Sequence, residues 1–300
     1  MSVLRERLTI RDLEQFSGIK AHTIRIWERR YGLLKPQRTT TNLRRYGLDE
    51  LKAVLNVAFL SKHGMRISRI AAATPAQRDN WVQEWSVRSD TDTVAMDELK
   101  LATLAYDTIA FRKVGERFEE RFGFEALFER LYLPYLEQLG LLWQTSAVCP
   151  AQEHFASLLV RQSLISRINA DTPVRNPKNE LFVLFLPENE LHELGLLYTQ
   201  FLLQRAGRTV IYLGQSVPLA DLARMARHFQ RPMTFIGMGT CMPPEKEVGS
   251  YVERMVASFD PEQVKVLLGG RLFGSWENDG DGPVKVFRSL AELRERLSLV

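Results

Sequence analysis

Apolar residues recur with a helical period over most of the first 170 positions, and this pattern changes after residue 180. From there on, short apolar runs alternate with amphipathic stretches. The predicted strands are Leu181–Leu186, Thr209–Leu213, Met233–Gly237, Val264–Leu268 and Val284–Phe287, and the predicted helices are Leu191–Ala206, Pro218–Phe229, Glu245–Phe259 and Leu290–Leu297. Strands that alternate with helices of this length indicate a Rossmann-like parallel sheet with helices on both faces.

The segment before this sheet is predicted to be helical throughout. Four apolar-faced stretches with short connections fill residues 96–170, which favours a four-helix bundle. The run Ser86–Thr93 is polar and rich in small residues, and it is the strongest linker candidate. We therefore expect a bundle in the middle of the chain, preceded by a flexible connection.

Two short helices are predicted at the start of the chain. Thr9 is placed to cap the first helix, Gly18 permits the turn after it, and the second helix runs from about Ala21 to Arg30. Such a pair forms a helix-turn-helix, whose second helix reads the major groove of DNA. Over residues 31–46 the character of the side chains alternates, and the segment is rich in Thr and Arg, which predicts a β-hairpin wing. The candidate DNA contacts are His22, Thr23, Arg25, Arg29, Arg30, Arg38, Asn42, Arg44, Arg45 and Tyr46.

Charge is divided unevenly along the 300-residue chain, whose net charge is +4. Residues 1–75 contain 15 Lys and Arg against 6 Asp and Glu, whereas the remainder contains 25 basic and 30 acidic residues. A basic module on an acidic body is expected where one domain meets phosphate. The expected regions are a winged-helix DNA-binding domain at 1–76, a linker at 77–95, the bundle at 96–172 and the sheet domain at 173–300.

Composition argues against membrane and secreted proteins. No apolar run approaches the roughly 20 residues of a membrane span, and the first residues lack the apolar stretch of a secretory signal. The two cysteines, Cys149 and Cys241, provide neither a disulfide framework nor a zinc cluster. We therefore expect a cytoplasmic protein without membrane contact.

Candidate chemistry gathers around one histidine that follows the first predicted strand. Ligands of parallel sheets bind beyond the carboxyl ends of the strands, where His192 and the pair Gly269-Gly270 are both expected. Glu190 can accept the second N–H of the imidazole and so fix its tautomer for metal binding. Gly195 and the glycine pair would leave room for a flat or bulky ligand. Taken alone, this pattern fits a surface histidine equally well.

A second group of candidate binding residues lies in the predicted bundle. Trp143 ends one predicted helix, and Glu153 and His154 lie in the first turn of the next one, after Pro150. A helix N-terminus directs its side chains and N–H groups toward whatever lies above it. By themselves these residues are also consistent with core packing and capping.

The N-terminal motifs resemble the MerR family of transcriptional regulators. The resemblance covers roughly residues 8–75, and its motifs are Thr23-Ile24-Arg25, Arg30-Tyr31-Gly32-Leu33, Pro36, Arg38 and Arg44-Arg45-Tyr46. That family binds DNA as a dimer, so the resemblance implies a double-stranded DNA operator and a second copy of the chain as partners. Metal sensors of the family carry cysteines after the DNA-binding domain, and this chain has no cysteine before Cys149.

The C-terminal motifs resemble the vitamin B12-binding domain. They are Glu190-x-His192-x-x-Gly195 and Gly269-Gly270. This resemblance implies cobalamin as cofactor, with His192 as the lower axial ligand of cobalt. The spacing Trp143-x9-Glu153-His154 resembles the cap over the adenosyl group in the CarH/LitR family of photoreceptor regulators, which has the same domain order.

The CarH/LitR resemblance implies a regulator, not an enzyme. Adenosylcobalamin would lie between bundle and sheet and favour a tetramer that holds DNA, and light would release the DNA. A B12-dependent enzyme, such as a methyltransferase activation unit, is disfavoured by the winged helix. The remaining length is also too short for a substrate-binding barrel.

The chain departs from this family at three places, one of which is Gln144, where the residue after the cap tryptophan can be a histidine. Its lead carboxylate is Glu190 where Asp is usual. The loop after the third strand is Gly237-Met238-Gly239 where the family has Ser-x-Leu, which holds the nucleotide tail of the cofactor. Thr240 is then the nearest hydroxyl, and we include Gly237 and Thr240 among the cofactor-binding candidates. The alternative is a regulator whose sheet binds no cobalamin and acts through protein contacts or another ligand.

Overall fold

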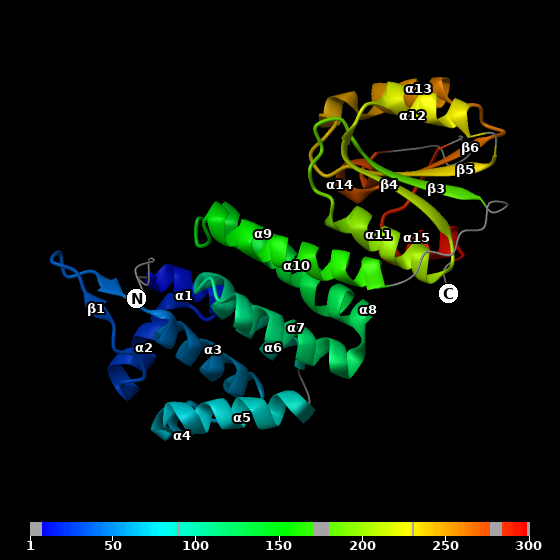
Figure 1. Cartoon of the computed structure of the whole chain (residues 1–300). Helices are drawn as coiled ribbons and strands as arrows, with labels where there is room; N and C mark the ends of the chain where they lie inside the picture. The colour runs from blue at the N-terminus through cyan, green and yellow to red at the C-terminus, as the bar shows by residue number, and fades with distance from the viewer. Residues whose placement is uncertain (1–7, 89–90, 171–179, 230, 277–283, 299–300) are drawn as a thin grey trace. The chain divides into compact units, whose positions relative to one another are not determined.

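The chain folds into two compact units, residues 1–160 and 161–300. The computed structural model describes residues 8–88, 91–170, 180–229, 231–276 and 284–298 (Figure 1). The boundary between the units falls inside helix α10 (Pro150–Ala170). None of the helices in the described ranges combines the length and the apolar character that crossing a membrane requires.

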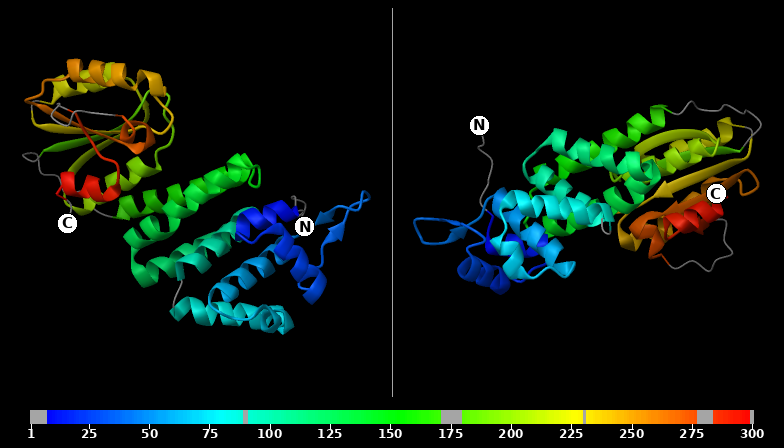
Figure 2. Two further views of the ribbon diagram at one scale, coloured as in Figure 1. Left: turned by 180° about the vertical axis from the view of Figure 1, so that it is seen from behind. Right: turned by 90° about the horizontal axis from the view of Figure 1, so that it is seen from below.

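The first unit is helical apart from a two-stranded hairpin that projects from it (Figure 2). Its elements are α1 (Ile10–Ser17), α2 (Ala21–Tyr31), β1 (Gln37–Arg38), β2 (Arg44–Arg45), α3 (Leu48–Lys62), α4 (Ile67–Ala72), α5 (Pro75–Arg88), α6 (Thr91–Leu104), α7 (Thr108–Phe122), α8 (Phe124–Ala126), η1 (Leu127–Tyr132), α9 (Leu133–Gln144) and the first part of α10. The predicted helix-turn-helix and wing are thus present.

Local signals explain how the helix-turn-helix begins. The Thr9 hydroxyl accepts the N–H of Asp12, and the Asp12 carboxylate accepts the N–H of Thr9 at 2.6 Å, which forms the capping box of α1. Gly18 ends the helix with φ 71°, a left-handed conformation that glycine adopts without strain. On α2, Ile24 and Trp27 are buried as the pattern predicts.

The predicted linker at 77–95 is wrong, because α5 runs to Arg88 and α6 starts at Thr91. Pro75 begins α5, since a proline is tolerated in the first turn where its missing N–H has no helical partner. Thr74 caps this helix by accepting the N–H of Gln77 at 3.2 Å. The predicted boundary between 172 and 173 lies outside the described residues.

The bundle and the DNA-binding helices belong to one unit. Lys100 on α6 is buried, and its ammonium donates to Asp97 at 2.9 Å and to the carbonyl of Phe16, near the end of α1, at 3.4 Å. Burying a lysine is costly unless it is paired in this way. The contact therefore fixes α6 against the helix-turn-helix.

Aromatic rings fill the bundle core. The ring of Phe111 on α7 lies 6.0 Å from that of Tyr135 on α9, centroid to centroid, and 6.3 Å from that of Phe155 on α10. The buried Tyr135 hydroxyl pairs with Thr103 of α6 at 2.5 Å. The four predicted helical segments therefore share a core, although the third is α8, the π-helical η1 and α9 in succession.

The second unit is a five-stranded parallel sheet in the order β4-β3-β5-β6-β7. Helices α12 and α13 cover one face, and α11 and α15 cover the other (Figure 1). The elements are β3 (Leu181–Pro187), α11 (Leu194–Arg205), β4 (Thr209–Val217), α12 (Leu219–His228), β5 (Met233–Met238), η2 (Glu245–Glu247), α13 (Val248–Ser258), β6 (Val264–Gly269), α14 (Gly270–Gly274), β7 (Val284–Val286) and α15 (Leu290–Arg296).

This strand order decides where a ligand can bind. Strand β4 lies on one side of β3, and the later strands β5, β6 and β7 follow one another on the other side. The direction in which strands are added therefore reverses between β3 and β5, which is a topological switch point. Helix α11 starts at Leu194, three residues later than predicted. His192 therefore lies in the loop at the carboxyl end of β3, next to the switch point.

Candidate functional site

The candidate DNA-binding surface is the face of α2 opposite its buried residues. His22, Arg25 and Arg29 are exposed and follow one another at spacings of three and four, so they share one side of the helix. Arg30 is also exposed, and its guanidinium lies over the Tyr31 ring at 5.4 Å. Thr23 is partly buried beside His22.

A carboxylate connects this helix to the wing. Glu28 of α2 accepts Nε of Arg44 at 2.9 Å on one oxygen and the hydroxyl of Tyr46 at 3.0 Å on the other. Hydrogen bonding to Glu28 raises the pKa of Arg44, and burial together with Glu28 raises that of Tyr46. Tyr46 is 1% exposed, so its predicted DNA contact is wrong. It fixes the wing against α2 instead.

The tip of the wing remains a candidate contact. Arg38 is exposed and donates to the side chain of Asn42 at 2.6 Å, and Arg45 is partly buried. Asn42 has φ 63°, a conformation that asparagine tolerates in turns. Sequence reasoning missed Glu28, although a lone acid among the cations of α2 is a visible signal.

The cofactor candidate His192 is oriented by a buried carboxylate. Its Nδ1 lies 2.6 Å from Oε1 of Glu190, whose side chain is 1% exposed, whereas the imidazole itself is 59% exposed. A carboxylate partner keeps the proton on Nδ1 and leaves the lone pair on Nε2. Among the described residues Nε2 has no partner, so it is available to a ligand.

Glu190 lies in a cradle of backbone N–H groups. Its Oε1 accepts the N–H of Leu191 and His192, and its Oε2 accepts those of Thr240, Cys241 and Met242 at 2.6 to 2.9 Å. Burial alone would raise the pKa of Glu190, but these donors outweigh it and lower the pKa to about 2. Glu190 therefore stays ionised and joins the loop after β3 to the loop after β5.

The residue after the histidine is anchored as well. Glu193 is buried and accepts Nε of Arg161 at 2.5 Å and the hydroxyl of Tyr212 at 2.8 Å. Burial and then Glu193 raise the pKa of Tyr212. Sequence reasoning missed this group, whose only signal is a second acid beside His192. Carboxylates on both sides of the histidine thus restrain its loop.

The glycines of the site are closely packed. A Cβ on Gly269 would lie 2.1 Å from the ring of Phe287, and one on Gly237 would lie 2.6 Å from that of Phe185. Gly270 has φ 86°, and a Cβ on it would lie 2.6 Å from the carbonyl oxygen of Gly239. The protein itself fills the space beside these glycines, which corrects the expectation that it is open to a ligand.

Two further candidates lie in the same loops. A Cβ on Gly195 would meet the sulfur of Met238 at 3.1 Å, so the space beside Gly195 is also taken. Thr240 enters the site through its backbone N–H, which Glu190 accepts, and its carbonyl accepts from Arg271.

The bundle candidates lie together in sequence at the α9–α10 end of the first unit. Trp143 is in the last turn of α9 and is 50% exposed. His154 is exposed in the first turn of α10, with Nδ1 3.9 Å from Glu153 Oε2. An exposure of 50% is unusual for a core tryptophan, so core packing alone does not explain Trp143.

Comparison with known proteins connects both units to regulators. Residues 8–77 match the family described as MerR HTH family regulatory protein. The chain is 30% identical over 262 residues to the HTH-type transcriptional repressor CarH of Myxococcus xanthus, which covers 85% of this chain and 86% of CarH. It is 28% identical over 268 residues to the repressor CarA of the same organism, over 88% of this chain and 86% of CarA.

A solved structure shares the fold. The Methanosarcina barkeri monomethylamine corrinoid protein aligns with a TM-score of 0.55 and 13% identity, over 70% of this chain and 100% of that protein. The predicted combination of a helical region and a Rossmann-like sheet is thus confirmed. The chain belongs to the family of MerR-type helix-turn-helix transcriptional regulators that includes CarH and CarA.

Proposed function

We propose that this chain is a DNA-binding repressor whose sheet domain binds cobalamin, and that this cofactor controls its oligomeric state. The observation that carries the proposal is the pair of buried Glu190 and exposed His192 next to the switch point of the sheet. Its similarity to repressors over most of its length supports the regulatory role. The fold shared with a corrinoid protein supports the choice of ligand.

The metal-ligating group at the carboxyl ends of the strands suits a metal that is already held by a cofactor. His192 offers one nitrogen, whereas a metal ion held by protein alone usually takes three or four side chains. In the described residues, no group of three or more His, Cys, Asp and Glu side chains is arranged to hold an ion. His192 would bind cobalt, and Glu190 would hold the imidazole in the required tautomer.

We propose that residues of the bundle also bind the cofactor. Trp143 and His154 are exposed and Glu153 is partly buried, and together they carry one flat ring and two polar groups, which suit a nucleoside. We propose adenosylcobalamin as the form bound, which would supply a cobalt–carbon bond that light can break. Exposed Leu141 and Leu158 on α9 and α10 give the same region an apolar surface, which supports control of assembly there.

DNA binding is assigned to α2 and the wing. Arg25 and Arg29 would enter the major groove, and Arg38 and Arg45 would contact phosphate. We expect one such module from each copy of a dimer to bind a half-site.

The decisive experiment is the absorbance spectrum of the full chain purified from cells supplied with B12. Wild type is expected to be red and to contain cobalt. His192→Ala should lose affinity or alter the spectrum, whereas His228→Ala, at an exposed histidine on α12, should match wild type. If His192→Ala binds with the affinity and spectrum of wild type, the axial-ligand assignment is wrong.

Assembly and DNA binding need separate measurements. Light scattering in darkness and after illumination, with and without adenosylcobalamin, should show a larger species in the dark with cofactor. Equal sizes under all conditions would contradict control by the cofactor. Arg25→Ala should weaken binding to the operator, whereas Arg224→Ala, on the sheet domain, should not. Equal affinities would contradict the assigned DNA surface.

One observation favours a second candidate function. The spaces beside Gly237 and Gly269 are filled by the protein, which would also suit a sheet domain that binds no cobalamin and acts through protein contacts or another ligand. A colourless, cobalt-free protein from B12-supplied cells would select this alternative.

A further inference from the structure

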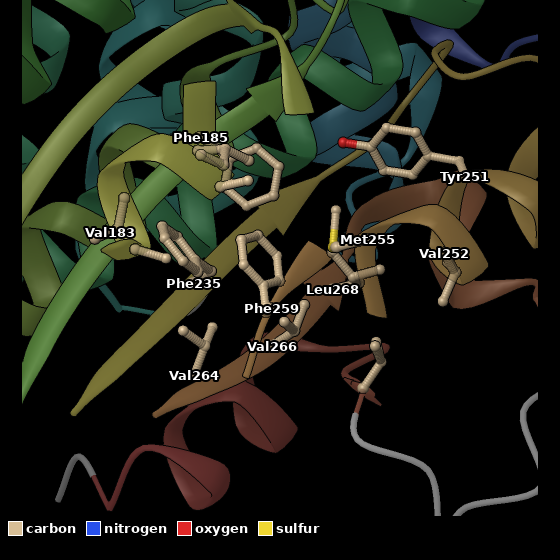
Figure 3. Close-up of a cluster of buried hydrophobic side chains, with 14 of the residues drawn as sticks. Val183, Phe185, Phe235, Tyr251, Val252, Met255, Phe259, Val264, Val266 and Leu268 are labelled. Carbon is tan, nitrogen blue, oxygen red and sulfur yellow. The ribbon is translucent and has the colours of Figure 1, made fainter. Parts of the chain in front are cut away.

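The carboxyl end of the sheet is closed on its α12–α13 face. Phe185, Gly237 and Leu268 stand side by side on β3, β5 and β6. The side chains of Phe185 and Leu268 close over the glycine, because a Cβ on Gly237 would lie 2.6 Å and 2.9 Å from them. Both belong to one buried cluster, which also holds the ring of Phe235 (Figure 3). Phe185 and Leu268 therefore fill the space beside Gly237 on this face.

The α11–α15 face is closed as well. Met238 and Gly269 are neighbours on β5 and β6, and the ring of Phe287 lies over Gly269. Met238 in turn approaches Gly195 of α11. Met238 and Phe287 are buried in the cluster on this face. In the described part of the sheet domain, apolar side chains thus take the space beside Gly237 on one face and beside Gly269 and Gly195 on the other.

Closed packing of this kind restricts what a cobalamin could do here. Cobalamin carries a nucleotide tail that ends in dimethylbenzimidazole, and this base occupies the cobalt face that His192 would use. When an imidazole takes that position, the tail must leave the cobalt and lie elsewhere. Housing it inside the protein requires a slot of aromatic size between the sheet and a helix layer. Protein interiors are packed too densely to admit such a group without displacing a ring.

We propose, building on the proposed cobalamin function, that the chain binds a corrinoid through its ring and cobalt alone and leaves the nucleotide tail outside the sheet domain. The phenylalanines at 185 and 287 take the place of a tail within the two layers. His192 and the Glu190 cradle lie above them at the loops and remain available. A corrinoid without a tail is then a full ligand.

The test compares methylcobalamin with methylcobinamide, which has the same ring and methyl group but no nucleotide. Both are titrated into the full chain in dim light, and binding is followed by absorbance. We expect methylcobinamide to bind at least as tightly as methylcobalamin, because only methylcobalamin must first release its own base from cobalt. Methylcobalamin that binds more than about tenfold tighter would overturn the inference and leave the proposed function intact. If neither binds, the proposed function fails and the inference fails with it.

A second measurement reports the tail directly and needs no variant. The phosphodiester of bound methylcobalamin gives a ³¹P resonance whose width depends on its mobility. A narrow line is expected for a tail in solvent, whereas a line broadened to the tumbling rate of the protein would overturn the inference. His192→Ala should weaken methylcobinamide at least as much as methylcobalamin, because the base of methylcobalamin can occupy the cobalt face that the histidine leaves. A loss confined to methylcobalamin would contradict tail exclusion.

Discussion

Replacing Glu190 by Gln keeps the shape of the side chain and removes its charge. The carboxylate is 1% exposed, and its two oxygens accept five backbone N–H groups together with Nδ1 of His192. An amide has one acceptor end and one donor end. Whichever way it turns, an NH₂ group must face N–H donors, so at least two of these hydrogen bonds are lost.

The size of the effect follows from the pKa. Glu190 has a pKa of about 2 in the folded protein against an ordinary value of 4.5. Since one unit corresponds to about 1.4 kcal/mol, the ionised form stabilises the fold by about 3 kcal/mol. Because the folded pKa is the lower one, this stability is complete above about pH 4.5 and is lost as the pH falls toward 2. Glu190→Gln should therefore destabilise the sheet domain by about 3 kcal/mol at pH 7.

The assay is urea unfolding of the full chain by circular dichroism at several pH values, together with hydrogen exchange of the amides at residues 240–242. Wild type should lose stability between pH 4.5 and 3 more steeply than Glu190→Gln, and these amides should exchange faster in the variant. Glu190→Asp is the matched control, since it keeps the charge on a shorter arm. A Gln variant within about 0.5 kcal/mol of wild type, a difference ordinary for surface changes, would refute the argument.

Three other changes test separate contacts. Glu28→Gln removes a negative charge near DNA, but it also weakens the ion pair that holds Arg44 and the wing. Operator affinity, measured by fluorescence anisotropy, should therefore fall. Tighter binding would show that the loss of charge outweighs the loss of wing placement. Lys100→Met removes the ammonium that donates to the Asp97 carboxylate and the Phe16 carbonyl. It should cost about 1–3 kcal/mol in urea unfolding, and an unchanged midpoint would contradict this contact. Gly269→Ala should cost about 1–3 kcal/mol, which Phe287→Leu should partly restore; strictly additive losses would argue against this packing.

Much of the fold could be predicted because the apolar period differs between helices and buried strands. All five strands of the sheet start where the pattern places them. The linker prediction failed because a polar, small-residue run such as Ser86–Thr93 describes an exposed surface and leaves the backbone state open. The helix before this run is instead determined by its cap and its packing. Thr74 and Pro75 begin α5, and α3 packs against it. Composition alone does not contain that tertiary contact.

In the site, too, local contacts could be predicted from the sequence and contacts between distant elements could not. Glu190 and His192 could be predicted because their interaction is local, two residues apart. Arg161 and Tyr212 reach Glu193 from elements distant in sequence, so no spacing reports them. A glycine in the sequence shows only that a side chain is missing. It does not show whether a ligand or a ring from a distant residue fills that space. For Gly269 that ring belongs to Phe287. Whether the chain holds a complete cobalamin therefore depends on residues that no cofactor motif includes.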